Sequence, residues 1–304
     1  MLTLAHLSDV HLPMPRVRLG ELGSKRLIGY HSWNFRRRHI HERSIADAVR
    51  DDILAAQPDH VALTGDLINI SARAEFPAGL DWLKSLGAPD YVTFVPGNHD
   101  AYVPVPFEQG LGLWGPWMAG DLRIGVPPEP GHGIAFPFVR QRRNVALIGL
   151  STALPQPIGY ATGRLGRAQI EALAVILAEL RKRGFCRIVL IHHPPIPGLI
   201  EPRKALIDAP DLKVVLEEEG AELVLFGHTH EDHVLDLASR HGPVHLFGVA
   251  SASANGTMGR PPADWCLYRV RRQDGVWRIS ASRRRYDPAA RTLRDETSFE
   301  LACG

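Results

Sequence analysis

Residues 91–100 read YVTFVPGNHD, a short apolar run followed by a cluster of polar side chains. The run 91–95 is rich in β-branched and aromatic residues, so it predicts a buried strand. A Pro-Gly pair ends the strand, and Asn98, His99 and Asp100 follow at its carboxyl end. Carboxylate, amide and imidazole groups are metal ligands, and burying them without a partner is costly. The stretch therefore predicts a strand that brings metal ligands to the edge of a sheet.

Four other apolar runs end in the same manner. Leu2–Leu7 precedes Asp9 and His11, His60–Thr64 precedes Asp66 and Asn69, Ile188–Ile191 precedes His192 and His193, and Leu223–Phe226 precedes His228 and His230. In an extended segment, side chains at positions i and i+2 point to the same side, so each D-x-H or H-x-H pair can bind one ion. Glycine precedes three of the five groups, and the lack of a Cβ suits a close backbone approach. Because the carboxyl ends of strands gather at one edge of an α/β sheet, we expect a single site.

The rest of the chain predicts an α/β fold. Val145–Leu150 and Val244–Val249 predict further strands. Two segments between strands have apolar residues at helical spacing and predict helices. The apolar residues are Ile45, Ala48, Val49 and Ile53 in the first segment, and Ile170, Leu173, Leu177 and Leu180 in the second. Alternation of strands and helices is typical of α/β proteins with buried sheets.

We expect one main domain over residues 1–260, with inserts at about 13–38 and 101–143. Both inserts interrupt the alternation and predict long loops. In the remaining segment, 261–304, the residues Asp274-Gly275 lie between two alternating runs and indicate a hairpin. This segment is predicted to be a β-hairpin extension packed on the same domain.

Net charge, cysteine content and the lengths of the apolar runs narrow the class of protein. The net charge of only +2 does not favour a nucleic-acid partner. The three cysteines, Cys186, Cys266 and Cys303, are odd in number and widely spaced, which predicts reduced thiols rather than a disulfide framework. The first residues do not resemble a signal peptide, and no apolar run approaches the ~18 residues of a membrane span. These features predict a cytoplasmic protein, with peripheral membrane contact left open.

Taken together, the five groups resemble the signature of the calcineurin-like metallophosphoesterase superfamily. The elements D-x-H, G-D-x-x-N, G-N-H-D, a strand-end His and G-H-x-H are all present between residues 2 and 255. The G-N-H-D and H-H-P-P forms resemble most the branch of class III cyclic nucleotide phosphodiesterases and glycerophosphodiesterases. The resemblance implies two facing mixed β-sheets flanked by helices, a four-layer α-β-β-α sandwich. It also implies a catalytic domain over residues 1–260.

The resemblance also implies a ligand set. One metal ion is expected on Asp9, His11, Asp66 and His230, and a second on Asp66, Asn98, His192 and His228, with Asp66 between them. His99 and Asp100 are the catalytic candidates: His99 faces the substrate, and Asp100, with Asn69, orients ligands or His99. His193 is expected to pack behind the ligands. Mixed His, carboxylate and amide ligands suit Mn, Fe or Zn, and such two-metal sites attack phosphorus with a metal-bridging hydroxide.

Three functions remain open for this sequence. The first is hydrolysis of a small phosphorylated substrate, a nucleotide or glycerol-type phosphodiester. The second follows from the basic insert, residues 16–43, which carries Arg and Lys with Tyr30, Trp33 and Phe35. Such a segment is either a solvated loop or a contact for anionic lipid, as in a membrane-surface pyrophosphohydrolase of UDP-2,3-diacylglucosamine. The third is a metal-bound interaction scaffold without turnover. The oligomeric state is not predicted.

Overall fold

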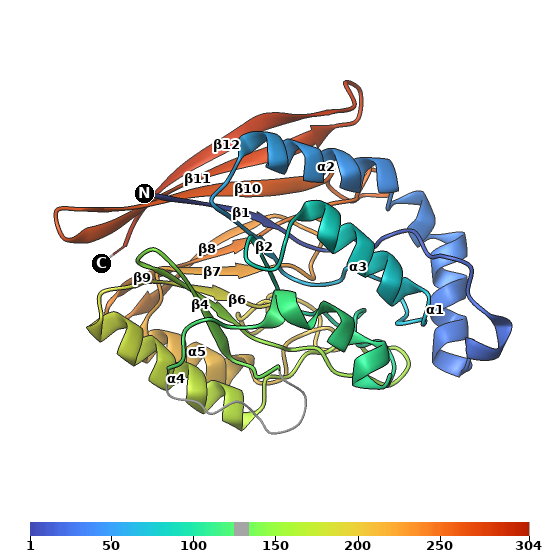
Figure 1. Ribbon diagram of the computed structural model, residues 1–304, viewed down its shortest axis with the longest axis horizontal. Helices are drawn as coiled ribbons and strands as arrows, with labels where there is room; N and C mark the ends of the chain where they lie inside the picture. Colours follow the sequence, from blue (N-terminus) through green and yellow to red (C-terminus); the bar gives the residue numbers. More distant parts are fainter. Residues whose placement is uncertain (125–133, 304) are drawn as a thin grey trace.

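All seven predicted strands are present in the computed structural model, which describes residues 1–124 and 134–303. They belong to two six-stranded mixed sheets that face each other (Figure 1). In order across the first sheet the strands are β12 (Thr292–Ala302), β11 (Val276–Asp287), β10 (Asp264–Gln273), β1 (Leu2–Leu7), β2 (His60–Leu63) and β3 (Val92–Phe94). In order across the second they are β4 (Phe138–Arg142), β5 (Val145–Gly149), β6 (Cys186–Leu190), β7 (Leu223–Phe226), β9 (Gly242–Gly248) and β8 (His233–Ser239).

Helices cover the two sheets and complete the predicted four-layer sandwich. Helices α2 (Arg43–Ala56) and α3 (Glu75–Leu86) pack on the first sheet, and α4 (Arg167–Lys182) and α5 (Ala209–Glu219) pack on the second (Figure 1). Helix α1 (Ser24–Phe35) lies at one end of the molecule. Four short 3-10 helices complete the described elements: η1 (Leu19–Glu21), η2 (Arg37–His39), η3 (Phe107–Gln109) and η4 (Leu111–Met118).

Burial on both faces explains why the central strands read as unbroken apolar runs. In β6, Ile188 and Leu190 join the core between the sheets, whereas Val189 packs in the core under α4 and α5. Strands β5, β6, β7 and β9 pair in parallel, as do β1, β2 and β3. Parallel pairing aligns their carboxyl ends, so each sheet presents a row of strand ends at one edge.

The two stretches predicted as long loops contain regular structure. Residues 13–38 include α1 and the start of η2, and residues 101–143 include η3, η4 and β4, apart from 125–133, which lie outside the described residues. Helix α1 escaped prediction because Leu27, Ile28 and Phe35 are exposed, so no apolar stripe marks a buried face.

The C-terminal strands are an integral part of the first sheet. Strand β10 pairs antiparallel with β1, with Leu2 opposite Val270. The turn between β10 and β11 contains Asp274 and Gly275, both with positive φ, as the hairpin signal predicts. Strand β1 therefore has a partner on each side and holds its carboxyl end in a fixed position.

Candidate metal centre

The five polar groups meet at the carboxyl ends of β1, β2, β3, β6 and β7. Backbone hydrogen bonds join the loops within each sheet: the Asp9 N–H donates to the Gly65 carbonyl, and the Gly227 N–H donates to the His192 carbonyl, each at 3.0 Å. A third bond crosses between the sheets, where the His228 N–H donates to Asp9 Oδ2 at 2.9 Å. The site is thus assembled from both sheets.

Five of the predicted ligands have a left-handed backbone conformation. The φ angles are 55° at Asp9, 43° at His11, 54° at Asp66, 69° at His228 and 58° at His230. A non-glycine residue in this region is uncommon and persists only where the surroundings hold it in place. The strain turns these side chains off the strand direction and toward one another.

Glycines allow the loops to approach closely. A Cβ at Gly97 would lie 2.3 Å from Asp66 Oδ1, and a Cβ at Gly227 would lie 1.9 Å from Ser8 Oγ and 2.5 Å from Asp9 Oδ2. All three distances are far below van der Waals contact. Any larger residue at these positions would displace a predicted ligand.

Asp9, His11 and His230 form the first group of ligand atoms. His230 Nε2 lies 3.2 Å from Asp9 Oδ1 and 3.1 Å from His11 Nε2. His11 Nε2 is 3.8 Å from Asp9 Oδ1. Asp9 Oδ1 is buried and accepts no hydrogen bond, although burial of an unpaired carboxylate oxygen is costly. A cation at this point would satisfy it.

Asp66, Asn98, His192 and His228 form the second group. His192 Nε2 lies 3.4 Å from Asp66 Oδ2, 3.2 Å from Asn98 Oδ1 and 3.3 Å from His228 Nδ1. The two groups share Asp66, because its Oδ2 also lies 3.8 Å from His11 Nε2. All seven predicted ligands are therefore brought together, and their mixed carboxylate, amide and imidazole donors suit divalent transition metals.

Backbone carbonyls orient the histidine rings. His192 Nδ1 donates to the Thr64 carbonyl at 2.6 Å, and His228 Nε2 donates to the Lys204 carbonyl at 2.9 Å. His11 Nδ1 lies 3.3 Å from the Ile68 carbonyl. In each ring the other nitrogen faces the site, an arrangement typical of metal-binding histidines. At His11 this nitrogen, Nε2, also lies 3.1 Å from Arg37 Nη2.

The charges of the site are strongly coupled. Burial opposes ionisation of Asp66, but His192 and its neighbours outweigh it and hold the pKa of Asp66 below its usual range. Burial also opposes protonation of His192, yet the Asp66 carboxylate raises the pKa of His192 to about 9. A proton on His192 thus balances the buried negative charge, and a metal cation can replace it at the same position.

The Asp100 carboxylate joins the loop that follows β2 to the loop that follows β3. Its Oδ2 accepts the N–H groups of Asp66 and Gly97, both at 2.8 Å, and its Oδ1 accepts those of Leu67 and Ile68 at 2.9 and 3.2 Å. With four backbone donors on one buried carboxylate, Asp100 positions Asp66 rather than facing a substrate.

The other predicted residues occupy distinct places. His99 Nδ1 bonds to the Asn69 carbonyl, while the Asn69 side chain donates to the Leu12 carbonyl. Burial and then Arg37 lower the pKa of His99 to about 4, so its ring is neutral. Both ring nitrogens of His193 are engaged, with Thr152 Oγ1 at 2.7 Å and the Ala161 carbonyl at 3.0 Å, which agrees with a packing role.

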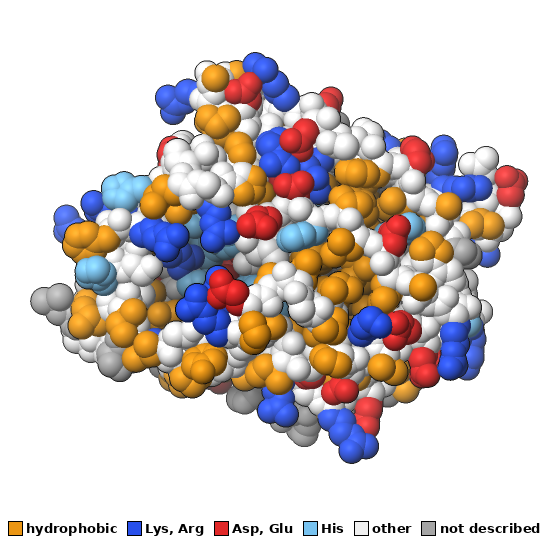
Figure 2. Space-filling model, turned by 180° about the vertical axis from the view of Figure 1, so that it is seen from behind, with side chains coloured by type: hydrophobic (Ala, Val, Ile, Leu, Met, Phe, Trp, Pro, Cys, Tyr) orange, Lys and Arg blue, Asp and Glu red, His pale blue; other side chains and the backbone are white. Residues whose placement is uncertain are grey.

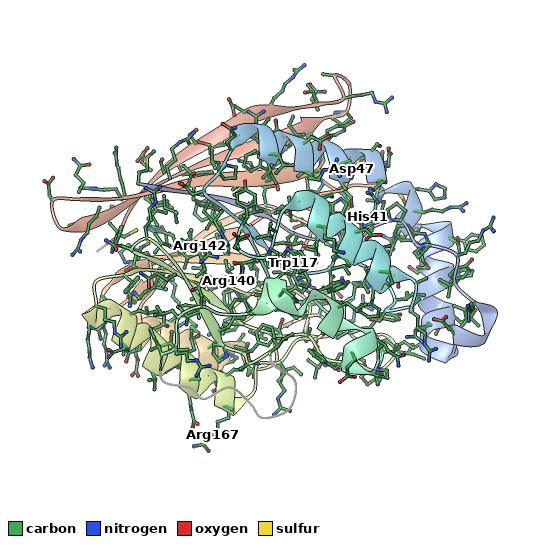
Figure 3. The ribbon with its side chains drawn as sticks, in the orientation of Figure 1. His41, Asp47, Trp117, Arg140, Arg142 and Arg167 are labelled. Carbon is green, nitrogen blue, oxygen red and sulfur yellow. The ribbon has the colours of Figure 1, made fainter. Side chains whose placement is uncertain are left out.

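Two residues of the site were not predicted from the sequence. The first is His41, which lies at the junction of η2 and α2 and is labelled in Figure 3. Its ring centroid is 4.7 Å from that of His11 and 5.4 Å from that of His230. Arg37, from the basic insert, places its guanidinium against the rings of His11 and His99. Figure 2 shows histidine side chains at the bottom of a hollow with basic side chains along its rim. No periodic pattern in the insert marks these two residues as inward-facing.

Comparison with known proteins identifies the family and the fold. The family model described as calcineurin-like phosphoesterase matches residues 2–232. A probable cyclic nucleotide phosphodiesterase of Synechococcus sp. is 27% identical over 236 residues, which cover 77% of this chain and 80% of that protein. A dimetal phosphatase from Danio rerio has a similar fold, with a TM-score of 0.61, 13% identity, and coverage of 100% and 99% of the two chains. A purple acid phosphatase from yellow lupin matches with a TM-score of 0.56 and 12% identity, over 99% of this chain and 53% of its own.

The chain belongs to the calcineurin-like phosphoesterase family, and it is a metal-dependent phosphoric ester hydrolase. Its three cysteines are buried and free, as the sequence predicts. Among the described residues, none of the helices has the length and apolar character that crossing a bilayer requires.

Proposed function

We propose that the protein hydrolyses a phosphodiester of a small nucleotide or glycerol-type substrate with two divalent ions. The position of Asp66 carries this proposal, because its Oδ2 lies 3.8 Å from His11 and 3.4 Å from His192, one residue from each ligand group. A shared carboxylate offsets part of the repulsion between two cations. Mn, Fe and Zn all suit these ligands.

We assign the residues of the site to the two ions and to the substrate as follows. The first ion is assigned to Asp9, His11, Asp66 and His230, and the second to Asp66, Asn98, His192 and His228. Bound ions of this kind supply Lewis acidity and lower the pKa of a water molecule. Asp100 fixes the loop that carries Asp66, and His99 is positioned beside the ligands to contact the reacting phosphoryl group or its leaving oxygen.

The first experiment compares two chromogenic esters, bis(p-nitrophenyl) phosphate and p-nitrophenyl phosphate, with protein stripped of metal and then given Mn²⁺. We expect Mn²⁺-dependent hydrolysis with preference for the diester. Asp66→Ala is expected to lose metal from both positions and at least a hundredfold in kcat/KM. The matched control, Asp81→Ala, changes an exposed carboxylate of α3 and should behave like the wild type.

Two outcomes would contradict the proposal. Full metal content in Asp66→Ala would remove Asp66 from its shared position. If neither ester is hydrolysed in a metal-dependent manner, the phosphodiesterase proposal is wrong. The remaining alternatives are then hydrolysis of a lipid-linked diphosphate and a metal-bound scaffold without turnover.

A second candidate, an enzyme acting on a lipid-linked phosphate at a membrane surface, is favoured by the exposed face of α1. Leu27, Ile28 and Phe35 are 53%, 50% and 73% exposed on this helix. They lie on one side of α1, and Arg16, Arg18 and Arg36 are exposed in the same insert. An apolar face with basic neighbours matches the surface of an anionic bilayer. A nucleotide-lipid diphosphate such as UDP-2,3-diacylglucosamine is a substrate of that kind.

A further inference from the structure

His41 brings a third imidazole to the first group of ligand atoms. One nitrogen each of His11, His41 and His230 lie within 4.8 Å of one another. The ring centroids are 4.7 Å apart for His11 and His41, 5.4 Å for His41 and His230, and 4.9 Å for His11 and His230. Three imidazoles that bind one ion at about 2.1 Å have ring centroids roughly 4.5–5.5 Å apart. The three rings are therefore spaced as rings around a single cation would be.

The segment that follows β9 fixes the backbone of His41. His41 forms an antiparallel bridge with Ala254, and Ser8, at the end of β1, forms a parallel bridge with Ser251 of the same segment. One short stretch of chain is thus bound to His41 on one side and to the strand end that carries Asp9 on the other. The distance between these two residues is set by the fold.

A chain of hydroxyl groups also fixes the direction of the His41 ring. Ser251 Oγ donates to the Asp9 carbonyl at 2.6 Å and lies 3.3 Å from Ser253 Oγ, which in turn lies 2.9 Å from His41 Nδ1. A carbonyl only accepts, so the hydrogen of Ser251 is committed to it, and the same direction continued through Ser253 makes His41 Nδ1 the donor. The lone pair is then on Nε2. Histidines that bind metals typically donate from their other ring nitrogen in this way.

Packing restricts the ring further. The His41 side chain is 4% exposed. The indole of Trp33, a buried residue of α1, stacks on it with an interplanar angle of 9° and centroids 6.4 Å apart. The ring therefore has little room to turn away from His11 and His230.

We propose that His41 Nε2 is a further ligand of the first ion, so that this ion has three imidazole ligands. The assignment rests on the proposed two-ion function and extends the ligand set at its first position. The second position has only two imidazoles, from His192 and His228, together with the amide oxygen of Asn98. The two positions therefore differ in their donor atoms.

The third imidazole gives the first position a preference among metals. Imidazole suits Zn²⁺ and Fe²⁺, whereas oxygen ligands suit Mn²⁺. The first position should accordingly favour Zn²⁺ over Mn²⁺ more strongly than the second position does.

The test measures metal binding and needs no turnover. Stripped protein is titrated with Zn²⁺ and with Mn²⁺ against a chromophoric chelator, and separately with Co²⁺, whose visible absorption depends on the ligands around it. In His41→Asn the amide can still donate to Ser253 but has no atom at the place of Nε2. We expect this variant to bind one of its two Zn²⁺ ions about tenfold or more weakly than the wild type, with a changed Co²⁺ spectrum. At that position the ratio of Zn²⁺ to Mn²⁺ affinity should fall as well, whereas the other position should be unchanged.

Two further variants complete the comparison. His41→Gln places an amide oxygen near the position of Nε2, so its Zn²⁺ affinity should lie between those of His41→Asn and the wild type. The matched control His39→Asn changes an exposed histidine two residues away and should bind metal like the wild type.

Unchanged Zn²⁺ affinities and an unchanged Co²⁺ spectrum in His41→Asn would overturn the assignment. Equal losses in His41→Asn and His41→Gln would trace the effect to packing rather than to a ligand atom and would also overturn it. Failure of the proposed function is distinguishable from either outcome. If the wild type hydrolyses no phosphodiester, that function is wrong, whereas the titrations decide the role of His41 without any substrate.

Discussion

His60 shows how single buried side chains make the stability of this protein depend on pH. Arg142 Nε donates to His60 Nδ1 at 3.2 Å, and His60 Nε2 donates to Thr93 Oγ1 at 2.7 Å. Figure 3 shows Arg142, on β4 of the second sheet, reaching toward the first sheet. Burial first, and then the charges of Arg142 and Arg140, lower the pKa of His60 to about 2. The folded protein thus holds this ring in its neutral form.

We predict that His60 destabilises the protein as the pH falls below 6.5. The unfolded chain then binds a proton at His60 while the folded chain does not, so the free energy of unfolding falls by about 1.4 kcal/mol per pH unit. This window extends from pH 6.5 down to the folded pKa of about 2. Between pH 7.5 and 5.0, urea unfolding should show the wild type losing about 2 kcal/mol more than His60→Gln. Equal losses in the two proteins would show that His60 is protonated in the folded state.

At the scale of the residue, local sequence patterns predicted the side chains that converge as candidate metal ligands, but not Arg37 and His41, which lie beside them. Asp9, Asp66 and His228 follow apolar runs, and the parallel order of strands dictates that such positions converge. Arg37 and His41 lie in a segment whose path depends on contacts with residues more than two hundred positions away, such as Ser253 and Asn255. Nothing in the local pattern of the insert encodes those contacts.

At the scale of the element, prediction succeeded where a strand is buried on both faces. The bounds of β1 and β7 agree with the apolar runs to the residue. Strands β8 and β12 were not predicted, because many of their residues are exposed and polar and leave no continuous apolar run. Helix α1 was missed for a related reason, since three of its large apolar residues face outward.

The outward face of α1 leads to a prediction about membranes. Leu27→Ser, Ile28→Ser and Phe35→Ser together should abolish sedimentation with phosphatidylglycerol vesicles, because they remove the apolar residues that would enter the bilayer surface. The wild type should bind these vesicles in a salt-sensitive manner and bind phosphatidylcholine vesicles weakly.

The control for this experiment uses apolar residues that are about as exposed as Leu27 and Ile28. The double variant Val175→Ser/Val214→Ser changes residues of α4 and α5 that are 54% and 52% exposed. Both residues lie outside the basic insert that carries α1. This variant should bind vesicles like the wild type. If the wild type does not bind phosphatidylglycerol vesicles, or if the α1 triple variant still binds them, the membrane-surface function is wrong.

At the scale of the whole molecule, the candidate metal centre lies across the interface of the two sheets. Asp9, Asp66 and Asn98 follow strands of the first sheet, whereas His192, His228 and His230 follow strands of the second. Beneath the site, the sheets pack through apolar contacts such as Phe247 against Tyr268, with ring centroids 5.6 Å apart. Ions bound to both rows of ligands would therefore act as cross-links between the sheets.

We predict from this arrangement that metal removal destabilises the entire fold. An ion that binds only the folded state at a thousand times its Kd adds about 4 kcal/mol to the free energy of unfolding. Adding Mn²⁺ to stripped protein should accordingly raise Tm by on the order of 5 °C or more. Asp66→Ala removes the one ligand assigned to both ions, so Tm should no longer respond to Mn²⁺. Asp81→Ala should respond like the wild type. If stripped and Mn²⁺-loaded wild type melt at the same temperature although the loaded sample contains metal, the ions do not connect the two sheets.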